Sequence, residues 1–459
     1  MNKSVWDVWD DVFQTFQDKV IVLDDDPTGV QTVHGVPVYT DWTLETIERI
    51  FQEKDRLQFI LTNSRALTPQ ETAAVHREIA TRIETMSQKW NVPYLLISRS
   101  DSTLRGHYPL ETETLKETIE RCGGKEFDGE VILPFFKEGG RLTIDNIHYV
   151  KTGNMLIPVG ETEFAKDRAF GFQASHLGEW IEEKTKGTYK KDDVTYITID
   201  EIRALNMNAI TDKLMAVKHF GKVVVNAIDE DDVVVFTIAL IRALNKGKRF
   251  LFRTAATFTK VIGNVRSRPL LTKEELLRDG CNNGGFIVIG SYVKKTTEQL
   301  KELKTLDQLH FIEFDCHLVL EETRFEKEME RVLNEAENML KRGVTTVIYT
   351  RRERLDLGEG KEEEQLKLSV KISDALTRFV RDLTVRPKYI IAKGGITSSD
   401  IGTKGLNVKR AIVAGQIAPG VPVWRTGDEC TFPNIPYIIF PGNVGEATTL
   451  KEVVLKLEK

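Results

Sequence analysis

Three consecutive aspartates, Asp24, Asp25 and Asp26, directly follow the apolar segment 20–23, and a Pro-Thr-Gly turn comes next. Adjacent carboxylates repel one another and cannot be buried without partners, so this stretch is not ordinary core. In open α/β sheets, ligands bind beyond the carboxyl ends of the strands. The pattern therefore predicts a strand that ends at a polar site.

Two further polar segments follow apolar ones. Thr62, Asn63, Ser64 and Arg65 come after segment 57–61. The second segment, 98–107, comes after 95–97 and contains Asp101, Ser102, Thr103, Leu104 and Arg105. Arginine binds carboxylates or phosphates through paired hydrogen bonds, and a carboxylate can orient a sugar hydroxyl or remove its proton. We expect one pocket for a hydroxylated carboxylic acid.

Two details of this pocket have simpler interpretations. Asp101 with its hydroxyl neighbours could be a helix cap, although a cap does not need flanking arginines, a glycine and a histidine. Gly139, Gly140 and Arg141 form a third polar turn. For that turn, a plain structural role is an equal interpretation.

Three glycine-containing turns follow apolar segments in the second half. Their candidate ligand contacts are Ser291 after 286–289, Gly394, Gly395, Ile396 and Thr397 after 389–392, and Gly442, Asn443, Val444 and Gly445 after 437–440. Glycine lets backbone N–H groups approach an anion, and a helix N-terminus adds a favourable dipole. The turns predict a nucleotide phosphate site. No P-loop or Rossmann dinucleotide motif is present.

The composition is that of an ordinary soluble protein, with 459 residues, 41% hydrophobic and 29% charged. A net charge of -5 gives no reason to expect a nucleic-acid or acidic-membrane partner. Four dispersed cysteines without a C-x-x-C pair favour a reduced, cytoplasmic protein. No apolar run is long enough for a membrane span, and the N-terminus does not resemble a signal peptide.

Apolar segments alternate with helix-like segments along the chain, which is typical of parallel sheets covered by helices. The length favours two domains. The charged, proline-containing segment 266–285 is the predicted linker between domains 1–265 and 286–459. We expect an α/β protein of two domains, each a mainly parallel sheet with flanking helices, with the active site in the cleft between them.

Several motifs, taken together, resemble one known family. They are DDDPTG at 24–29, TNSR at 62–65, SDSTLRGH at 100–107, EGGRLTIDNIHYV at 138–150, FRTAATF at 252–258, GSYVKKTTEQL at 290–300, KGGITSSDIGTKGL at 393–406, PGVPVW at 419–424 and PGNVG at 441–445. In type and order they resemble the four-carbon acid sugar kinase family, whose members use ATP to phosphorylate threonate, erythronate or their oxo derivatives. The resemblance covers nearly the whole chain.

This resemblance implies an N-terminal sugar-acid domain and a C-terminal nucleotide domain. Asp25, Arg65 and residues 101–104 would contact the acid, and the three glycine turns would contact ATP, which acts with Mg²⁺. Asp26 and Arg105 complete the predicted acid pocket. The acid's terminal hydroxyl would attack the γ-phosphoryl group, with either Asp25 or Asp101 as the base.

Two departures from the family pattern leave details open. Many members read ADDLTG where this chain has DDDPTG, and GGDTS or GGETS where it has GGITS. The acid absent at Ile396 leaves a metal or ribose contact unassigned, and the additional Asp24 could alter substrate choice. The identity of the acid, the metal ligands and the formation of a homo-oligomer also stay open.

Two alternative functions compete with a kinase. A haloacid-dehalogenase-type phosphatase would use Asp24 as nucleophile and Asp26 as acid, because residues 24–28 fit D-x-D-x-T. Such an enzyme also needs a late acidic pair after an apolar strand to hold magnesium, and Asp428 and Glu429 follow no such strand. A non-catalytic sensor of nucleotide and sugar acid would have the same pockets. ATP turnover distinguishes the kinase from such a sensor.

Overall fold

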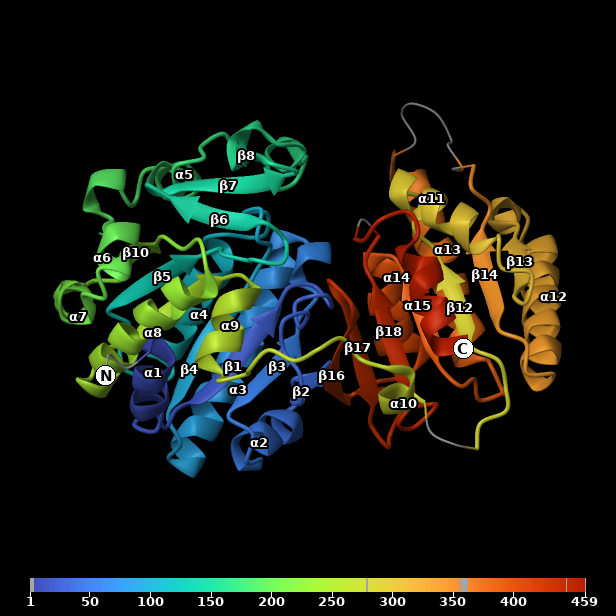
Figure 1. The fold of residues 1–459 in the computed structure, drawn as a ribbon, viewed down its shortest axis with the longest axis horizontal. Helices are drawn as coiled ribbons and strands as arrows, with labels where there is room; N and C mark the ends of the chain where they lie inside the picture. Colours follow the sequence, from blue (N-terminus) through green and yellow to red (C-terminus); the bar gives the residue numbers. More distant parts are fainter. Residues whose placement is uncertain (1–3, 278–279, 354, 356–361, 443, 459) are drawn as a thin grey trace. The chain divides into compact units, whose positions relative to one another are not determined.

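The computed structural model describes residues 4–277, 280–353, 355, 362–442 and 444–458. The chain divides into two compact units, Met1–Ser267 and Arg268–Lys459. Each unit contains a mainly parallel sheet with flanking helices (Figure 1). The predicted α/β class is confirmed. No helix among the described residues is both long and apolar enough to span a membrane.

The main sheet of the first unit is parallel throughout, in the order β2-β3-β1-β4-β11-β5-β10-β9. Its strands are β1 Lys19–Asp24, β2 Val36–Tyr39, β3 Leu57–Leu61, β4 Tyr94–Arg99, β5 Gly129–Leu133, β9 Thr195–Ile197, β10 Gly221–Val225 and β11 Phe250–Thr254. Residues 20–23 of β1 are all at most 2% exposed. Such burial on both faces is typical of a parallel sheet with helices on either side.

The helices of the first unit are α1 Val5–Phe13, α2 Leu44–Gln52, α3 Pro69–Trp90, α4 Leu110–Arg121, α5 Leu177–Lys184, α6 Ile199–Arg203, α7 Met207–Ala216, α8 Glu230–Asn245 and α9 Ala256–Ile262. Helices α2, α3 and α4 form a core with Ile21 and Leu23 of β1. Helix α3 begins at Pro69 because Thr68 and Glu71 form a capping box, and it ends at Trp90, where the next residue, Asn91, adopts the left-handed conformation.

A small antiparallel sheet of β6 Arg141–Ile144, β7 Ile147–Thr152 and β8 Met155–Pro158 also belongs to the first unit (Figure 1). Tight turns join its strands, with Asp145 and Asn146 between β6 and β7 both at positive φ. Aspartate and asparagine tolerate this conformation better than most residues. The sequence did not indicate this sheet beyond the turn at Gly139–Arg141.

The sheet of the second unit has the order β13-β14-β12-β15-β18-β17-β16, parallel from β13 to β18. Its strands are β12 Phe286–Ile289, β13 His310–Phe314, β14 Thr346–Thr350, β15 Ile390–Lys393, β16 Arg410–Ala418, β17 Val421–Thr426 and β18 Pro436–Phe440. Strands β16 and β17 are antiparallel and were not distinguished in sequence as a hairpin.

The helices of the second unit are α10 Lys273–Leu276, α11 Lys294–Leu303, α12 Glu322–Lys341, α13 Glu362–Arg381, α14 Gly395–Asp400 and α15 Thr449–Glu458. Helices α11 and α15 pack on one core of the sheet. Part of the predicted linker 266–285 joins this core, because Leu271 and Leu276 are buried in it. Residues 278–279 of that linker lie outside the described residues.

Candidate functional site

The predicted acid-site residues lie at the carboxyl ends of neighbouring parallel strands. In the order β3-β1-β4-β11, residues 62–65 follow β3, Asp25 and Asp26 follow β1, and residues 100–105 follow β4. Parallel strands bring their carboxyl ends to one edge of the sheet. The structure thus places these segments side by side in the first unit.

Arg65 holds two of the aspartates together. Its Nη2 and Nε donate to the two carboxylate oxygens of Asp25, at 2.6 and 3.1 Å, and its Nη1 lies 3.5 Å from Asp26 Oδ2. Burial raises the pKa of Asp25 even though Arg65 opposes the shift. Burial acts in the same direction on Asp26, but Arg65 and the hydrogen bonds from Thr28 outweigh it and lower the pKa of Asp26. Adjacent carboxylates thus differ in basicity.

Asp101 lies in the same polar cluster. It accepts hydrogen bonds from the Thr103 hydroxyl and from Arg105 Nε, the latter at 2.7 Å. Burial would raise the pKa of Asp101, but the positive charges of Arg65 and Arg105 hold it well below the ordinary value. Asp101 is therefore ionised at neutral pH. It is a weaker proton acceptor than Asp25.

Residues that the sequence interpretation did not single out hold these loops in place. Glu111 accepts from the hydroxyls of Ser64 at 2.6 Å and Ser100 at 3.4 Å, which ties the loop after β3 to the loop after β4. Arg253 donates through Nη2 to the backbone carbonyls of Asp101 and Arg105, at 3.4 and 3.1 Å. Arg253 lies within a family-like motif, and that signal could have identified it.

His148 of β7 secures the loop after β4 from the small sheet. Its Nε2 lies 2.7 Å from the Ser102 carbonyl and its Nδ1 lies 2.9 Å from Thr143 Oγ1. Burial lowers the pKa of His148 to about 4, so the ring is neutral at neutral pH. The carbonyl can only accept, so Nε2 carries the proton and Thr143 donates to Nδ1. The small sheet therefore supports the acid loop.

Arg141 of the third polar turn also lies near this cluster. The Phe164 ring lies 5.0 Å from the Arg105 guanidinium carbon and 5.7 Å from that of Arg141. The charges of Asp101 and Arg141 also interact. Two cations therefore share one aromatic partner beside Asp101, which adds positive charge to the site.

The position of Asp24 bears on the phosphatase interpretation. Asp24 is 1% exposed and lies against Gly29, where an added Cβ would be only 1.9 Å from its carboxylate. Burial raises the pKa of Asp24 to about 8 despite nearby Arg99, so the protonated form predominates at neutral pH. A buried, neutral carboxyl is a poor nucleophile, which does not favour the phosphatase interpretation.

Leu104 has a buried side chain within the hydrophobic cluster that also contains Tyr108 and Trp180. Its φ of 69° is unusual for a leucine and fixes the shape of the loop after β4. Any contact of Leu104 with a ligand must therefore come from its backbone.

The predicted nucleotide turns also lie together, at the carboxyl ends of the neighbouring strands β12, β15 and β18. Cβ atoms added at Gly394 and at Gly442 would each lie 3.0 Å from the Ser291 side chain. Gly394 has a φ of 128°, which glycine adopts at no steric cost. The turns thus pack closely around Ser291. Asn443 lies outside the described residues.

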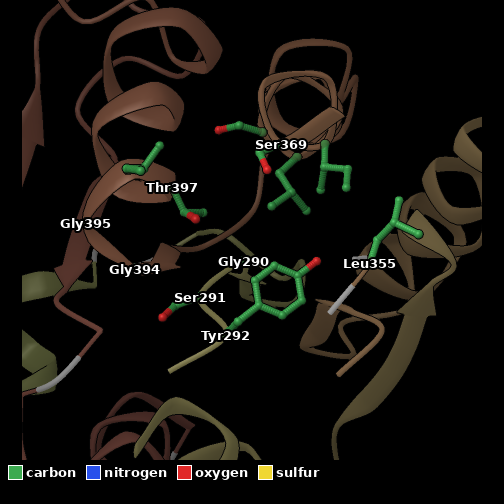
Figure 2. A pocket seen from close by; sticks show the side chains of 12 residues that line it. Gly290, Ser291, Tyr292, Leu355, Ser369, Gly394, Gly395 and Thr397 are labelled. Carbon is green, nitrogen blue, oxygen red and sulfur yellow. The ribbon is translucent and has the colours of Figure 1, made fainter. Parts of the chain in front are cut away.

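A cavity of about 430 Å³ opens beside two of these turns (Figure 2). It is lined by the predicted residues Ser291, Gly394, Gly395, Ile396 and Thr397 and by Gly290, Tyr292, Leu355, Ser369, Ile372, Ser373 and Leu376. Tyr292 and Ser369 lie on opposite sides of it in Figure 2. The volume suits a small organic ligand. The α13 residues 369–376 were missed because a helix face carries no turn motif.

Metal-binding side chains do not cluster in the part of the chain that the structure describes. No group of three or more His, Cys, Asp or Glu residues there could hold a metal ion. Magnesium, however, needs only one or two carboxylates when substrate phosphates supply other ligands.

Comparison with known proteins identifies the family. A model described as "Sugar-binding N-terminal domain" matches residues 20–262, and one described as "Nucleotide-binding C-terminal domain" matches 286–450. A D-erythronate kinase of Heliobacterium modesticaldum is 25% identical over 325 residues, which cover 69% of this chain and 67% of that relative. The chain belongs to the four-carbon acid sugar kinase family.

Solved structures share the fold of this family member. A Haemophilus influenzae protein has a TM-score of 0.64 at 16% identity, covering 95% of this chain and 100% of its own. A Salmonella typhimurium LT2 protein has a TM-score of 0.66 at 14% identity, covering 94% and 98%. At such identities the likeness concerns the fold alone. The sequence-based assignment to the family is confirmed by the family models.

Proposed function

We propose that this protein is an ATP-dependent kinase that phosphorylates the terminal hydroxyl of a four-carbon sugar acid of the erythronate, threonate or oxo-tetronate type. One observation carries the proposal: the chain has an arginine- and aspartate-rich site in one family domain and a glycine-turn site with a cavity in the other. A phosphatase would leave the second site without a role.

Charge distribution in the first site fits a hydroxylated carboxylate. Arg65, Arg105 and Arg141 supply positive charge for the acid group, and the ionised Asp101 can accept hydrogen bonds from hydroxyls. We assign the proton acceptor to Asp25, because its raised pKa makes it the stronger base of the two predicted candidates. Asp101 then orients the substrate.

The second site has two parts, which together fit a nucleotide. The cavity between Tyr292 and α13 would take the base and ribose, while the glycine turns would present backbone N–H groups to the phosphates. Mg²⁺ would be carried on the phosphates, where it neutralises charge. Catalysis would come mainly from positioning and charge stabilisation, as in other phosphoryl transfers.

A panel of four-carbon acids tests this proposal. Purified protein with ATP and Mg²⁺ is expected to release ADP only when an erythronate, threonate or oxo-tetronate stereoisomer is added, as measured by a coupled assay. Three- and five-carbon acids serve as controls for chain length. Nucleotide and acid binding without turnover across the panel would instead support the sensor.

A further inference from the structure

The turn after β18 has its backbone carbonyls tied to side chains. Thr296 Oγ1 donates to Gly442 at 2.9 Å, and Lys295 Nζ donates to Gly445 at 2.9 Å. Gln299 Nε2 donates to Val444 and Glu446, at 3.0 and 2.8 Å. In a planar trans peptide the N–H points opposite to the carbonyl. The N–H of Gly445 shares a peptide with the Val444 carbonyl and therefore points away from Gln299.

The N–H groups of this turn are available to a ligand. No described residue accepts a backbone hydrogen bond from the N–H of Gly442, Val444 or Gly445. Successive unpaired N–H groups of this kind form an anion-binding concavity. The turn is therefore arranged to receive phosphate oxygens.

Lys393, the last residue of β15, also donates hydrogen bonds to this turn. Its side chain is fully buried, and Nζ donates to the carbonyls of Pro441 and Gly442 at 2.5 and 3.2 Å. The Phe440 ring lies 4.2 Å from Nζ. The only charged group that shifts the pKa of Lys393 is another cation, Lys295, and among the described residues the hydrogen-bond partners of its Nζ are carbonyls rather than carboxylates.

A buried ammonium without a counter-ion is unfavourable. A neutral amine has two N–H groups, which match the two carbonyls that Lys393 contacts. Burial, reinforced by Lys295, lowers the pKa of Lys393 to about 7. A substantial fraction of the amine is therefore neutral at neutral pH in the ligand-free protein.

We propose that Lys393 supplies the buried positive charge that compensates the nucleotide polyphosphate, and that its amine takes up a proton from solvent when the nucleotide binds. The inference rests on the proposed nucleotide site. Phosphates on the adjacent N–H groups would bring in the negative charge that Lys393 lacks. Nucleotide affinity should then be constant below the pKa of the free amine and weaken above it, by up to about tenfold per pH unit.

Calorimetric titration of the full chain with ADP, between pH 7 and 9, tests this. ADP itself is fully ionised over most of this range, and two buffers of different ionisation enthalpy report the protons exchanged. Wild-type protein is expected to take up protons, approaching one per nucleotide near the middle of the range. Lys393→Arg should bind without proton uptake and with little pH dependence. Lys393→Met should bind more weakly and also without uptake.

Lys388→Met is the matched control. Lys388 precedes the same strand but pairs with Glu458 at 2.8 Å, so its loss should not affect proton uptake. If Lys393→Met does not fold, the comparison of proton uptake by wild type and by Lys393→Arg still tests the inference. Undiminished uptake in Lys393→Arg, or binding by wild type without uptake, would overturn the inference and leave the nucleotide site standing. No ADP binding by wild type at any pH would overturn both.

Discussion

Asp25→Asn is expected to lower kcat by about two to four orders of magnitude, which is the usual contribution of a positioned general base. Asparagine preserves the size of the side chain but cannot accept the substrate proton. Steady-state kinetics with the best acid of the panel measure the loss. ADP binding, measured by calorimetry, should be unchanged because the nucleotide turns belong to the other family domain.

The pH profile distinguishes a loss of proton transfer from a loss of the ion pair between Arg65 and Asp25. Because burial raises the pKa of Asp25 above 3.8, the acid limb of the wild-type profile should lie above the range of an ordinary aspartate. Activity should rise with pH as Asp25 loses its proton. Asp101→Asn should also lower turnover, but the acid limb of its profile should lie at the same pH as in wild type. A near-normal rate for Asp25→Asn would remove that residue from proton transfer.

Gly442→Val is expected to weaken ADP binding by roughly ten- to a hundredfold, the equivalent of losing one charge-assisted hydrogen bond. The added Cβ would lie 3.0 Å from Ser291 Oγ and 3.5 Å from Val293 Cγ2, so the branched side chain would crowd the phosphate-facing side. The backbone at Gly442 is outside the positive-φ region, so valine adds no left-handed backbone strain there.

Calorimetry of both ligands is the measurement for Gly442→Val, after circular dichroism has shown a folded protein. Affinity for the sugar acid should stay within the error of wild type. If this variant bound ADP normally and lost the acid instead, the assignment of the two ligands to the two domains would be reversed.

The strand ends of both sites could be predicted from sequence. Parallel strands bring their carboxyl ends to one edge, so apolar runs followed by Asp25, Arg65 and Asp101 were enough to group these residues. The same reasoning grouped Ser291 with Gly394 and Gly442. These inferences depend on local pattern and on one general property of parallel sheets.

Contacts that depend on distant elements could not be predicted. His148 reaches Ser102 from a separate small sheet, and Arg253 reaches the same loop from β11. The cavity wall on α13 also depends on tertiary packing, because Ser369 and Ser373 have no distinctive motif. The burial of Asp24 could not be predicted from sequence either. Consecutive aspartates look equivalent in sequence, but only the backbone path decides which one is buried against Gly29.

Phosphorus NMR of the reaction mixture tests the central claim most directly. Purified protein is incubated with ATP, Mg²⁺ and the acid that gives the highest ADP release, and proton-coupled spectra are recorded over time. The account predicts that the γ-phosphate signal of ATP is replaced by one phosphomonoester signal, split by the methylene protons of the terminal carbon. Conversion of ATP to ADP and inorganic phosphate alone, or unchanged ATP with every four-carbon acid, would contradict it.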